Sequence, residues 1–178
     1  MPRHLFLTGD IQVGKSTAIC KVLRTLNIPV GGFRTIAGNY TQDGSSEIYL
    51  VPAGTDAPIL HPENRVAKRH GAGCRFGFSA FSEVFDDVGT NLLQNTQRYP
   101  LILMDELGFL EKDAYGFQKA VLTCLAGSVP VLGVVRDRDS PFLNKVRSHP
   151  NVEVLLVTKE NRDLIYADLL ERFSALKP

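Results

Sequence analysis

The chain reads Gly9-Asp10-Ile11-Gln12-Val13-Gly14-Lys15-Ser16-Thr17 near its amino end, and this stretch decides the fold because it fits the pattern Gly-x4-Gly-Lys-[Ser/Thr]. Gly9 and Gly14 permit backbone angles and close approaches that a Cβ atom would block. The amide hydrogens of such a loop point inward and form a concave anion site, which the positive end of the following helix reinforces. The stretch therefore predicts a loop that binds the phosphates of a nucleoside triphosphate.

Two side chains of this loop have predicted roles of their own. The Lys15 ammonium would reach the β and γ phosphates, and the Ser16 hydroxyl would ligate Mg²⁺. A short apolar run over residues 4–8 predicts a buried strand before the loop. Apolar residues at helical spacing over residues 15–26 predict a helix after it, which Asn27 closes. The loop thus falls between a strand and a helix, as its mechanism requires.

A second acidic element follows residues 101–104, four consecutive apolar residues that suit a central parallel strand covered on both faces. Asp105 and Glu106 come next, at the edge of the sheet where ligands of open α/β folds collect. We predict that Asp105 joins Ser16 at the metal and that Glu106 polarises the attacking water as general base. Glu111 is a competing base, and the alternative for the Asp-Glu pair is two solvated carboxylates at a strand end.

The remaining pattern alternates strands with helices, which implies right-handed βαβ units around a mostly parallel sheet. An Asp43-Gly44 turn signal predicts a small β-hairpin insertion. We predict a single domain over residues 1–178 with an α/β, three-layer P-loop fold and helices on both faces of the sheet. Strands are expected at residues 30–36, 47–51, 129–135 and 152–157; helices at 79–97 with Ser79 as N-cap, 115–125, 141–147 with Ser140 as N-cap, and 160–176; and mostly loop at 55–74.

The composition narrows the class of protein and of partner. A net charge of +1 over 178 residues gives no global field that favours nucleic acid or an anionic membrane. The chain has three widely spaced cysteines, which fit neither a disulfide framework nor a zinc site. It shows no signal-peptide pattern and no run of the ~18 apolar residues that a membrane span needs. We therefore expect a cytoplasmic protein and leave a protein partner open.

Four segments spread over nearly the whole chain carry a family resemblance. They are residues 9–17, Gly32-Phe33, Asp105-Glu106-Leu107-Gly108-Phe109-Leu110-Glu111 and Thr158-Lys159-Glu160-Asn161-Arg162-Asp163. In order and spacing they resemble the small nucleoside-triphosphatase family known from thermophilic bacteria and archaea and, in mammals, as the cancer-related nucleoside-triphosphatase. The resemblance implies a slow hydrolase of several nucleoside triphosphates with a RecA-like or kinase-like P-loop core. That family usually has glycine where Gln12 stands and lysine where Phe109 stands.

Hydrolysis benefits from a cation beside the charge that develops on the γ-phosphate. The candidates are Arg34, which follows the Gly-Phe pair of the second strand, and Arg136 and Arg138, which follow the strand at 129–135. The alternative is that these arginines pair with neighbouring acidic residues. At the end of the last strand, Asn161 could hydrogen-bond the nucleobase and Arg162 could stack on it. Ordinary helix N-terminal chemistry is the alternative there.

A local basic cluster stands in the irregular middle of the chain. It could hold RNA or a second phosphate-bearing substrate, but a solvated loop is the favoured interpretation. The cluster consists of Arg65, Lys68, Arg69, His70 and Arg75, with Phe76 and Phe78 nearby.

Three functions fit these signals. The first is Mg²⁺-dependent hydrolysis of nucleoside 5′-triphosphates, ATP or GTP among them, to the diphosphate and phosphate. The second is a kinase that transfers the γ-phosphate to a nucleotide or other small acceptor. The third is a nucleotide-dependent switch whose slow hydrolysis resets a partner complex. The loop and the Asp-Glu pair favour hydrolysis.

Overall fold

A computed structural model describes residues 3–71 and 77–176, and an eight-stranded sheet runs through its centre. The strands lie in the order β5-β4-β3-β2-β6-β7-β1-β8. Within the run β2-β6-β7-β1-β8 all neighbouring strands pair in parallel. Beyond β2, strands β3, β4 and β5 extend the sheet by antiparallel pairing. The strands are β1 His4–Thr8, β2 Val30–Ala37, β3 Ser46–Pro52, β4 Arg65–Arg69, β5 Phe78–Ala80, β6 Leu101–Leu107, β7 Val131–Val135 and β8 Val152–Leu156.

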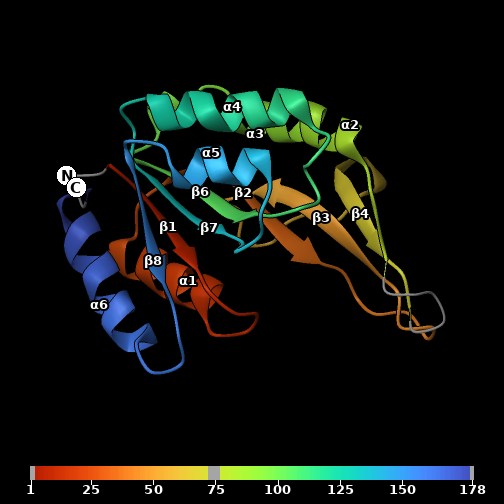
Figure 1. The fold of residues 1–178 in the computed structure, drawn as a ribbon, viewed down its shortest axis with the longest axis horizontal. Helices are drawn as coiled ribbons and strands as arrows, with labels where there is room; N and C mark the ends of the chain where they lie inside the picture. The colour runs from red at the N-terminus through yellow and green to blue at the C-terminus, as the bar shows by residue number, and fades with distance from the viewer. Residues whose placement is uncertain (1–2, 72–76, 177–178) are drawn as a thin grey trace.

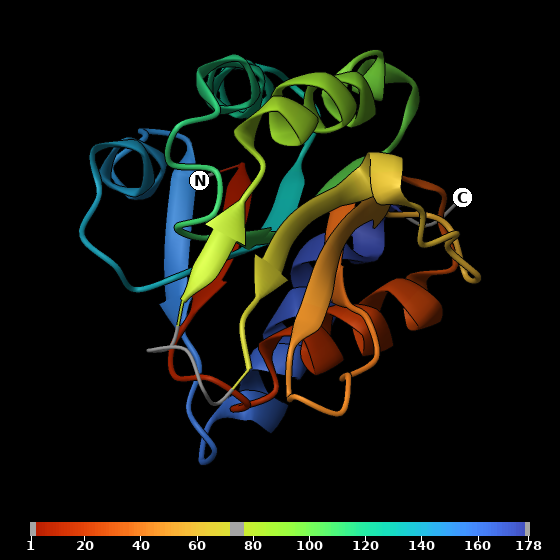
Figure 2. The same cartoon turned by 90° about the vertical axis from the view of Figure 1, so that its right-hand side faces the viewer.

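Helices cover both faces of the sheet, and Figures 1 and 2 show the two helical layers with the sheet between them. Successive residues of β1 point to opposite faces: Phe6 packs in the core under α4 and α5, and Leu5 and Leu7 pack in the core over α1 and α6. This is why the central strands are apolar throughout. The helices are α1 Lys15–Leu26, α2 Ser82–Val84, α3 Thr90–Leu93, α4 Tyr115–Ala126, α5 Pro141–Arg147 and α6 Arg162–Phe173, with short turns η1 Pro62–Asn64, η2 Phe85–Gly89 (π-helical), η3 Thr96–Arg98 and η4 Ser174–Leu176.

The predicted α/β class, mostly parallel sheet and two-sided helical cover are confirmed. Two helix boundaries also agree in detail. Asn27 ends α1 in the left-handed conformation, with φ of 52°. The Ser140 hydroxyl caps α5 by accepting a hydrogen bond of 3.1 Å from the Leu143 amide.

The middle of the chain differs from the prediction. The stretch expected to be mostly loop contains β4, and the predicted cap Ser79 lies in strand β5. Helical structure begins at Ser82 instead and ends at Leu93. The predicted hairpin insertion is therefore larger than expected, because β4 and β5 continue the antiparallel sheet that β3 begins. Figure 1 shows β3 and β4 reaching away from the helices.

The acidic pair also lies differently. β6 continues through Asp105 and Glu106 to Leu107 instead of ending before them. Its pairing with β7 steps from Met104↔Gly133 to Leu107↔Val135, which leaves one extra residue on β6 between the two pairs. Such an irregularity changes the direction in which side chains point, and here it lies at Asp105 and Glu106.

Candidate active site

The loop between β1 and α1 has the geometry of an anion cradle. Gly9 has φ of +131°, and a Cβ atom there would lie 2.3 Å from the Val157 carbonyl oxygen, so only glycine fits. Gly14 has φ of +105° at the start of α1. Gln12 also has positive φ, 65°, in the left-handed region that favours glycine. The loop lines a cavity of about 1020 Å³, the loop cavity, which is large enough for a nucleotide.

The Lys15 side chain folds back over this loop. Its ammonium donates to the carbonyl oxygens of Gly9 at 2.7 Å and Asp10 at 2.6 Å. Burial lowers the pKa of Lys15, Arg136 lowers it further, and Glu106 opposes the shift. A phosphate in the loop cavity would supply the strong anionic partner that this partly desolvated cation lacks.

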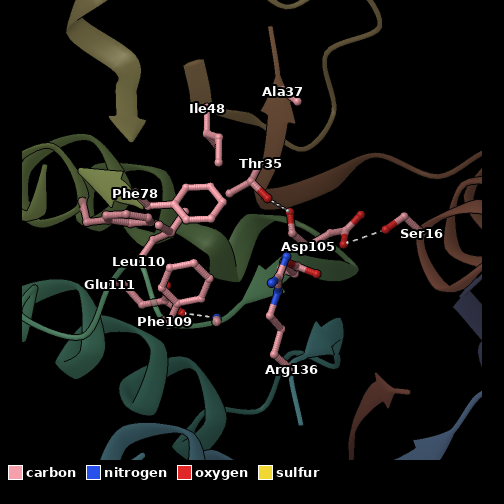
Figure 3. Close-up of a pocket in the computed structure, with 13 residues that line it drawn as sticks. Ser16, Thr35, Ala37, Ile48, Phe78, Asp105, Phe109, Leu110, Glu111 and Arg136 are labelled. Atoms are coloured by element: carbon pink, nitrogen blue, oxygen red, sulfur yellow. Dashed lines mark hydrogen bonds and ion pairs between the residues drawn. The ribbon is translucent and has the colours of Figure 1, made fainter. Parts of the chain in front are cut away.

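Ser16 and Asp105 come together although 89 residues separate them. The Ser16 hydroxyl donates to Asp105 Oδ1 at 3.0 Å, as Figure 3 shows. Asp105 is only 9% exposed, and burial raises its pKa to about 6 although the Ser16 hydrogen bond opposes the shift. A buried carboxylate beside a hydroxyl is a donor set that suits a hard cation, so these two residues fit Mg²⁺.

The strand order explains how Glu106 meets Arg136. β7 lies between β1, which leads into the loop, and β6, which carries the acidic pair. Arg136 follows β7 directly and forms an ion pair with Glu106. Both residues line the loop cavity. The structure thus brings Lys15, Ser16, Asp105, Glu106 and Arg136 to one edge of the sheet.

The other candidate arginines have different surroundings. Arg138 lines the loop cavity, and its guanidinium lies 4.8 Å from the centroid of the Phe109 ring. Arg34 instead donates to the Thr55 carbonyl at 2.6 Å and is not among the residues that line that cavity. Arg147, which the sequence analysis missed, donates to the carbonyl oxygens of Arg136, at 2.6 Å, and Arg138. It therefore positions the segment that carries both cations.

The two predicted base-binding residues, Asn161 and Arg162, differ in what their side chains contact. The Asn161 amide bonds to backbone on both sides, accepting from the Thr158 amide at 2.8 Å and donating to the Leu156 carbonyl at 2.9 Å. It shapes the turn before α6. Arg162 begins α6, and its side chain lies close to Gly14. Two exposed apolar side chains line the loop cavity: Ile11 of the predicted loop, 77% exposed, and Leu156, 60% exposed, which had no sequence signal as a ligand.

Glu111, the competing base, is 2% exposed and accepts a hydrogen bond from the Gly108 amide. Burial raises the pKa of Glu111 to about 7, from an ordinary 4.5, although that hydrogen bond opposes the shift. The folded protein therefore keeps this proton over a pH range in which the unfolded chain has released it. Stability contributed by the protonated group is present below pH 4.5 and is lost as pH rises towards 7.

We predict that Glu111→Gln removes this pH dependence, because glutamine keeps the shape and the acceptor but does not ionise. Relative to the variant, the wild type should lose roughly 3 kcal/mol of unfolding free energy between about pH 5 and about pH 8. Urea unfolding of both proteins at the two pH values measures the change. The pH dependence that Asp105 contributes to the unfolding free energy is the same in both proteins and cancels in the comparison. A difference between the proteins that stays constant with pH would contradict the prediction.

The basic cluster is part of the sheet extension. Arg65 forms an ion pair with Glu47, the Arg69 guanidinium donates to the Tyr40 hydroxyl at 3.1 Å, and a His70 ring nitrogen lies 2.8 Å from the Ser79 hydroxyl. Arg65, Lys68 and Arg69 of the cluster therefore lie in strand β4 and not in the predicted loop. Arg75 and Phe76, with Cys74, lie outside the described residues. Over residues 3–71 and 77–176, every helix is too short or too polar to traverse a lipid bilayer.

Comparisons with known proteins agree with this arrangement. A family model described as NTPase matches residues 4–170. The human cancer-related nucleoside-triphosphatase is 30% identical over 193 residues, covering 96% of each chain. The nucleoside-triphosphatase THEP1 of Methanosarcina barkeri is 28% identical over 182 residues, covering 98% of this chain and 99% of that one. The crystal structure of THEP1 from Aquifex aeolicus has the same fold, with a TM-score of 0.73 at 20% identity over 98% of this chain and 99% of that chain.

Proposed function

The chain belongs to the NTPase family and is a nucleoside-triphosphatase. We propose that it hydrolyses nucleoside 5′-triphosphates to the diphosphate and phosphate, with Mg²⁺ as cofactor. The observation that carries the proposal is the contact between the Ser16 hydroxyl and Asp105 Oδ1 beside the Lys15 ammonium. It joins the phosphate loop to the acidic strand at one point. Substrate binding is assigned to Gly9, Asp10, Ile11, Gln12, Val13, Gly14, Lys15, Ser16 and Thr17.

In this mechanism the loop amides and Lys15 hold the triphosphate tail. On binding, the Lys15 ammonium exchanges its two carbonyl partners for β and γ phosphate oxygens. Ser16 and Asp105 would hold Mg²⁺, which supplies neutralisation of phosphate charge when bound. The phosphates are thereby fixed with their γ end towards β6.

Glu106 acts as general base at that end. Its carboxylate accepts a proton from the water that attacks the γ-phosphorus, in line with the leaving diphosphate. Arg136, which lines the loop cavity and pairs with Glu106, stabilises charge on the γ-phosphate. Glu111 keeps a supporting role, since its carboxyl is buried against the Gly108 amide. Arg34 acts on Asp105 through its charge rather than on the phosphate.

The nucleobase lies at the other end of the loop cavity. There Ile11 and Leu156 offer exposed apolar surface to a base of any type. Asn161 holds the turn through its backbone contacts, which leaves Arg162 to stack on the base. Non-specific apolar contact and stacking would let the site take several nucleotides.

We also propose a cytoplasmic location. Cys20 and Cys124 are free thiols, as expected in a reducing compartment.

Phosphate release from each common nucleoside triphosphate tests the proposed function. We expect steady release with Mg²⁺, and a fall of at least about tenfold when a chelator removes the metal, because the phosphate charge is then left uncompensated. Restoring Mg²⁺ should restore the rate. A rate that does not change on chelation, in a sample that is folded by circular dichroism, would contradict the assignment of Ser16 and Asp105.

A further inference from the structure

A second cavity, which we call the side pocket, adjoins the loop cavity on the side of β6. Its volume is about 240 Å³. It shares three lining residues with the loop cavity, namely Ser16, Glu106 and Arg136. The two cavities therefore meet where the γ-phosphate would lie. A lytic water takes up about 30 Å³, so the side pocket has room for much more than that water.

One wall of the side pocket is apolar and aromatic, and Figure 3 shows its rings opposite the polar groups. The Phe78 and Phe109 rings meet edge to face, with centroids 5.1 Å apart. Arg136 and Arg138 lie over the Phe109 ring at 5.6 Å and 4.8 Å, which holds that ring in place. Ile48 closes the wall from β3. Aromatic walls favour a ring-shaped ligand, which can contact them edge to face or offset-stacked.

The opposite wall carries hydrogen-bonding groups, and among them carboxyl groups outnumber cationic groups. The carboxyl groups of Asp105 and Glu106 line it together with the guanidinium of Arg136, whereas the buried Glu111 carboxyl lies on the side of the Phe109 ring. Carboxylates accept hydrogen bonds from hydroxyl groups and repel a phosphate dianion. The pocket therefore suits a neutral ring compound with a hydroxyl arm and disfavours a nucleoside monophosphate.

From this geometry we propose that the side pocket binds a neutral, hydroxyl-bearing ring compound and that the protein transfers the γ-phosphoryl group to its hydroxyl. The proposal rests on the proposed function, because the donor is the triphosphate held by Lys15 and Ser16. An acceptor hydroxyl that donates to the Glu106 carboxylate from the side pocket stands where the attacking water would stand. Transfer and hydrolysis then compete for one phosphoryl group.

The chemical step balances without a further reactant. The acceptor oxygen forms a bond to the γ-phosphorus as the bond from that phosphorus to the β,γ-bridging oxygen breaks. The hydroxyl proton passes to the Glu106 carboxylate, and the bond electrons leave with the nucleoside diphosphate. The products are a phosphate monoester and the diphosphate, with nothing oxidised or reduced.

The test uses a triphosphate labelled at the γ position and measures labelled phosphate and labelled ester together. The acceptor probes are 3-pyridylmethanol, pyridoxine, uridine and thymidine, with thymidine monophosphate as the charged counterpart. Ala37→Phe fills the side pocket from β2, away from the phosphate loop. Ala57→Phe adds the same ring at another exposed alanine, outside the pocket lining, and is the matched control.

We expect a labelled ester from at least one neutral probe with the wild type and with Ala57→Phe. The added ring occupies space that the acceptor needs and leaves the phosphate loop unchanged, so the ratio of ester to phosphate should fall at least about tenfold in Ala37→Phe. Labelled phosphate without ester from any probe would overturn the inference and leave the hydrolase intact. An undiminished ratio in Ala37→Phe, or a preference for thymidine monophosphate over thymidine, would also overturn it. Absence of both products would overturn the proposed function as well.

Discussion

Lys15→Ala is expected to lower kcat/KM for triphosphate hydrolysis by at least about a hundredfold, the effect of removing a charge-stabilising group from a preorganised site. The Lys15 ammonium is the loop's own cation, and it now rests on the carbonyl oxygens of Gly9 and Asp10. Alanine would remove from the β and γ phosphates the only cationic side chain that the loop of residues 9–17 itself contains. Steady-state phosphate release as a function of nucleotide concentration measures the loss.

Lys21→Ala is the matched control for this variant. Lys21 lies exposed on the same helix, α1, outside the lining of the loop cavity. Its replacement removes the same charge from the chain and should leave kcat/KM close to that of the wild type. Equal losses in the two variants would mean that net charge, not the loop, determines activity.

Glu106→Gln is expected to lower kcat at least about tenfold while KM changes little, because a positioned general base contributes about 10²–10⁴-fold to the chemical step. Glutamine keeps the size of the side chain and an oxygen that Arg136 can bond, but it cannot take up the proton of the attacking water. Phosphate release under saturating nucleotide gives kcat, and the same titration gives KM.

The control for Glu106→Gln is Glu83→Gln, an exposed glutamate outside the active-site cavities, which should turn over normally. Full activity in Glu106→Gln would remove that carboxylate from the mechanism. A large rise in KM with unchanged kcat would show instead that Glu106 acts by placing Arg136 for substrate binding. Glu111 would then be the next carboxyl to test.

The local parts of the fold could be predicted because their signals are local. Residues 4–8, the glycine-rich loop and the helix at 15–26 each follow from apolar spacing and backbone conformational limits, and the structure has all three. The apolar run at 101–104 is likewise a central strand, although it continues to Leu107. The two strands are buried on both faces, so their sequences carry the pattern strongly.

The parts that could not be predicted depend on tertiary context. In β4, Val66 and Ala67 are adjacent and both fully buried, which breaks the alternation expected of a strand. β5 has only three residues, all exposed, and exists because β4 pairs with it. The ion pair between Glu106 and Arg136 arises because β7 lies next to β6, and no spacing in the sequence reveals that order.

The side pocket also could not be predicted from the sequence, because it depends on tertiary context. Its lining comes from β2, β3, β5 and β6, from Ser16 and Phe85, and from the residues that follow β6 and β7, so it requires the sheet extension that the sequence pattern did not reveal. The role of the phosphate loop could be inferred from eight residues, whereas the neighbourhood of the γ-phosphate needed the strand order.

Calorimetric titration of the folded protein with a non-hydrolysable triphosphate and Mg²⁺ tests the central claim most directly. Binding between the Lys15 loop and the phosphates predicts saturable heat with one nucleotide per chain for the wild type and Lys21→Ala. It predicts at least about tenfold weaker affinity for Lys15→Ala, since a charge-assisted contact is lost. Heat indistinguishable from dilution with a folded wild-type sample, or undiminished affinity in Lys15→Ala, would contradict it.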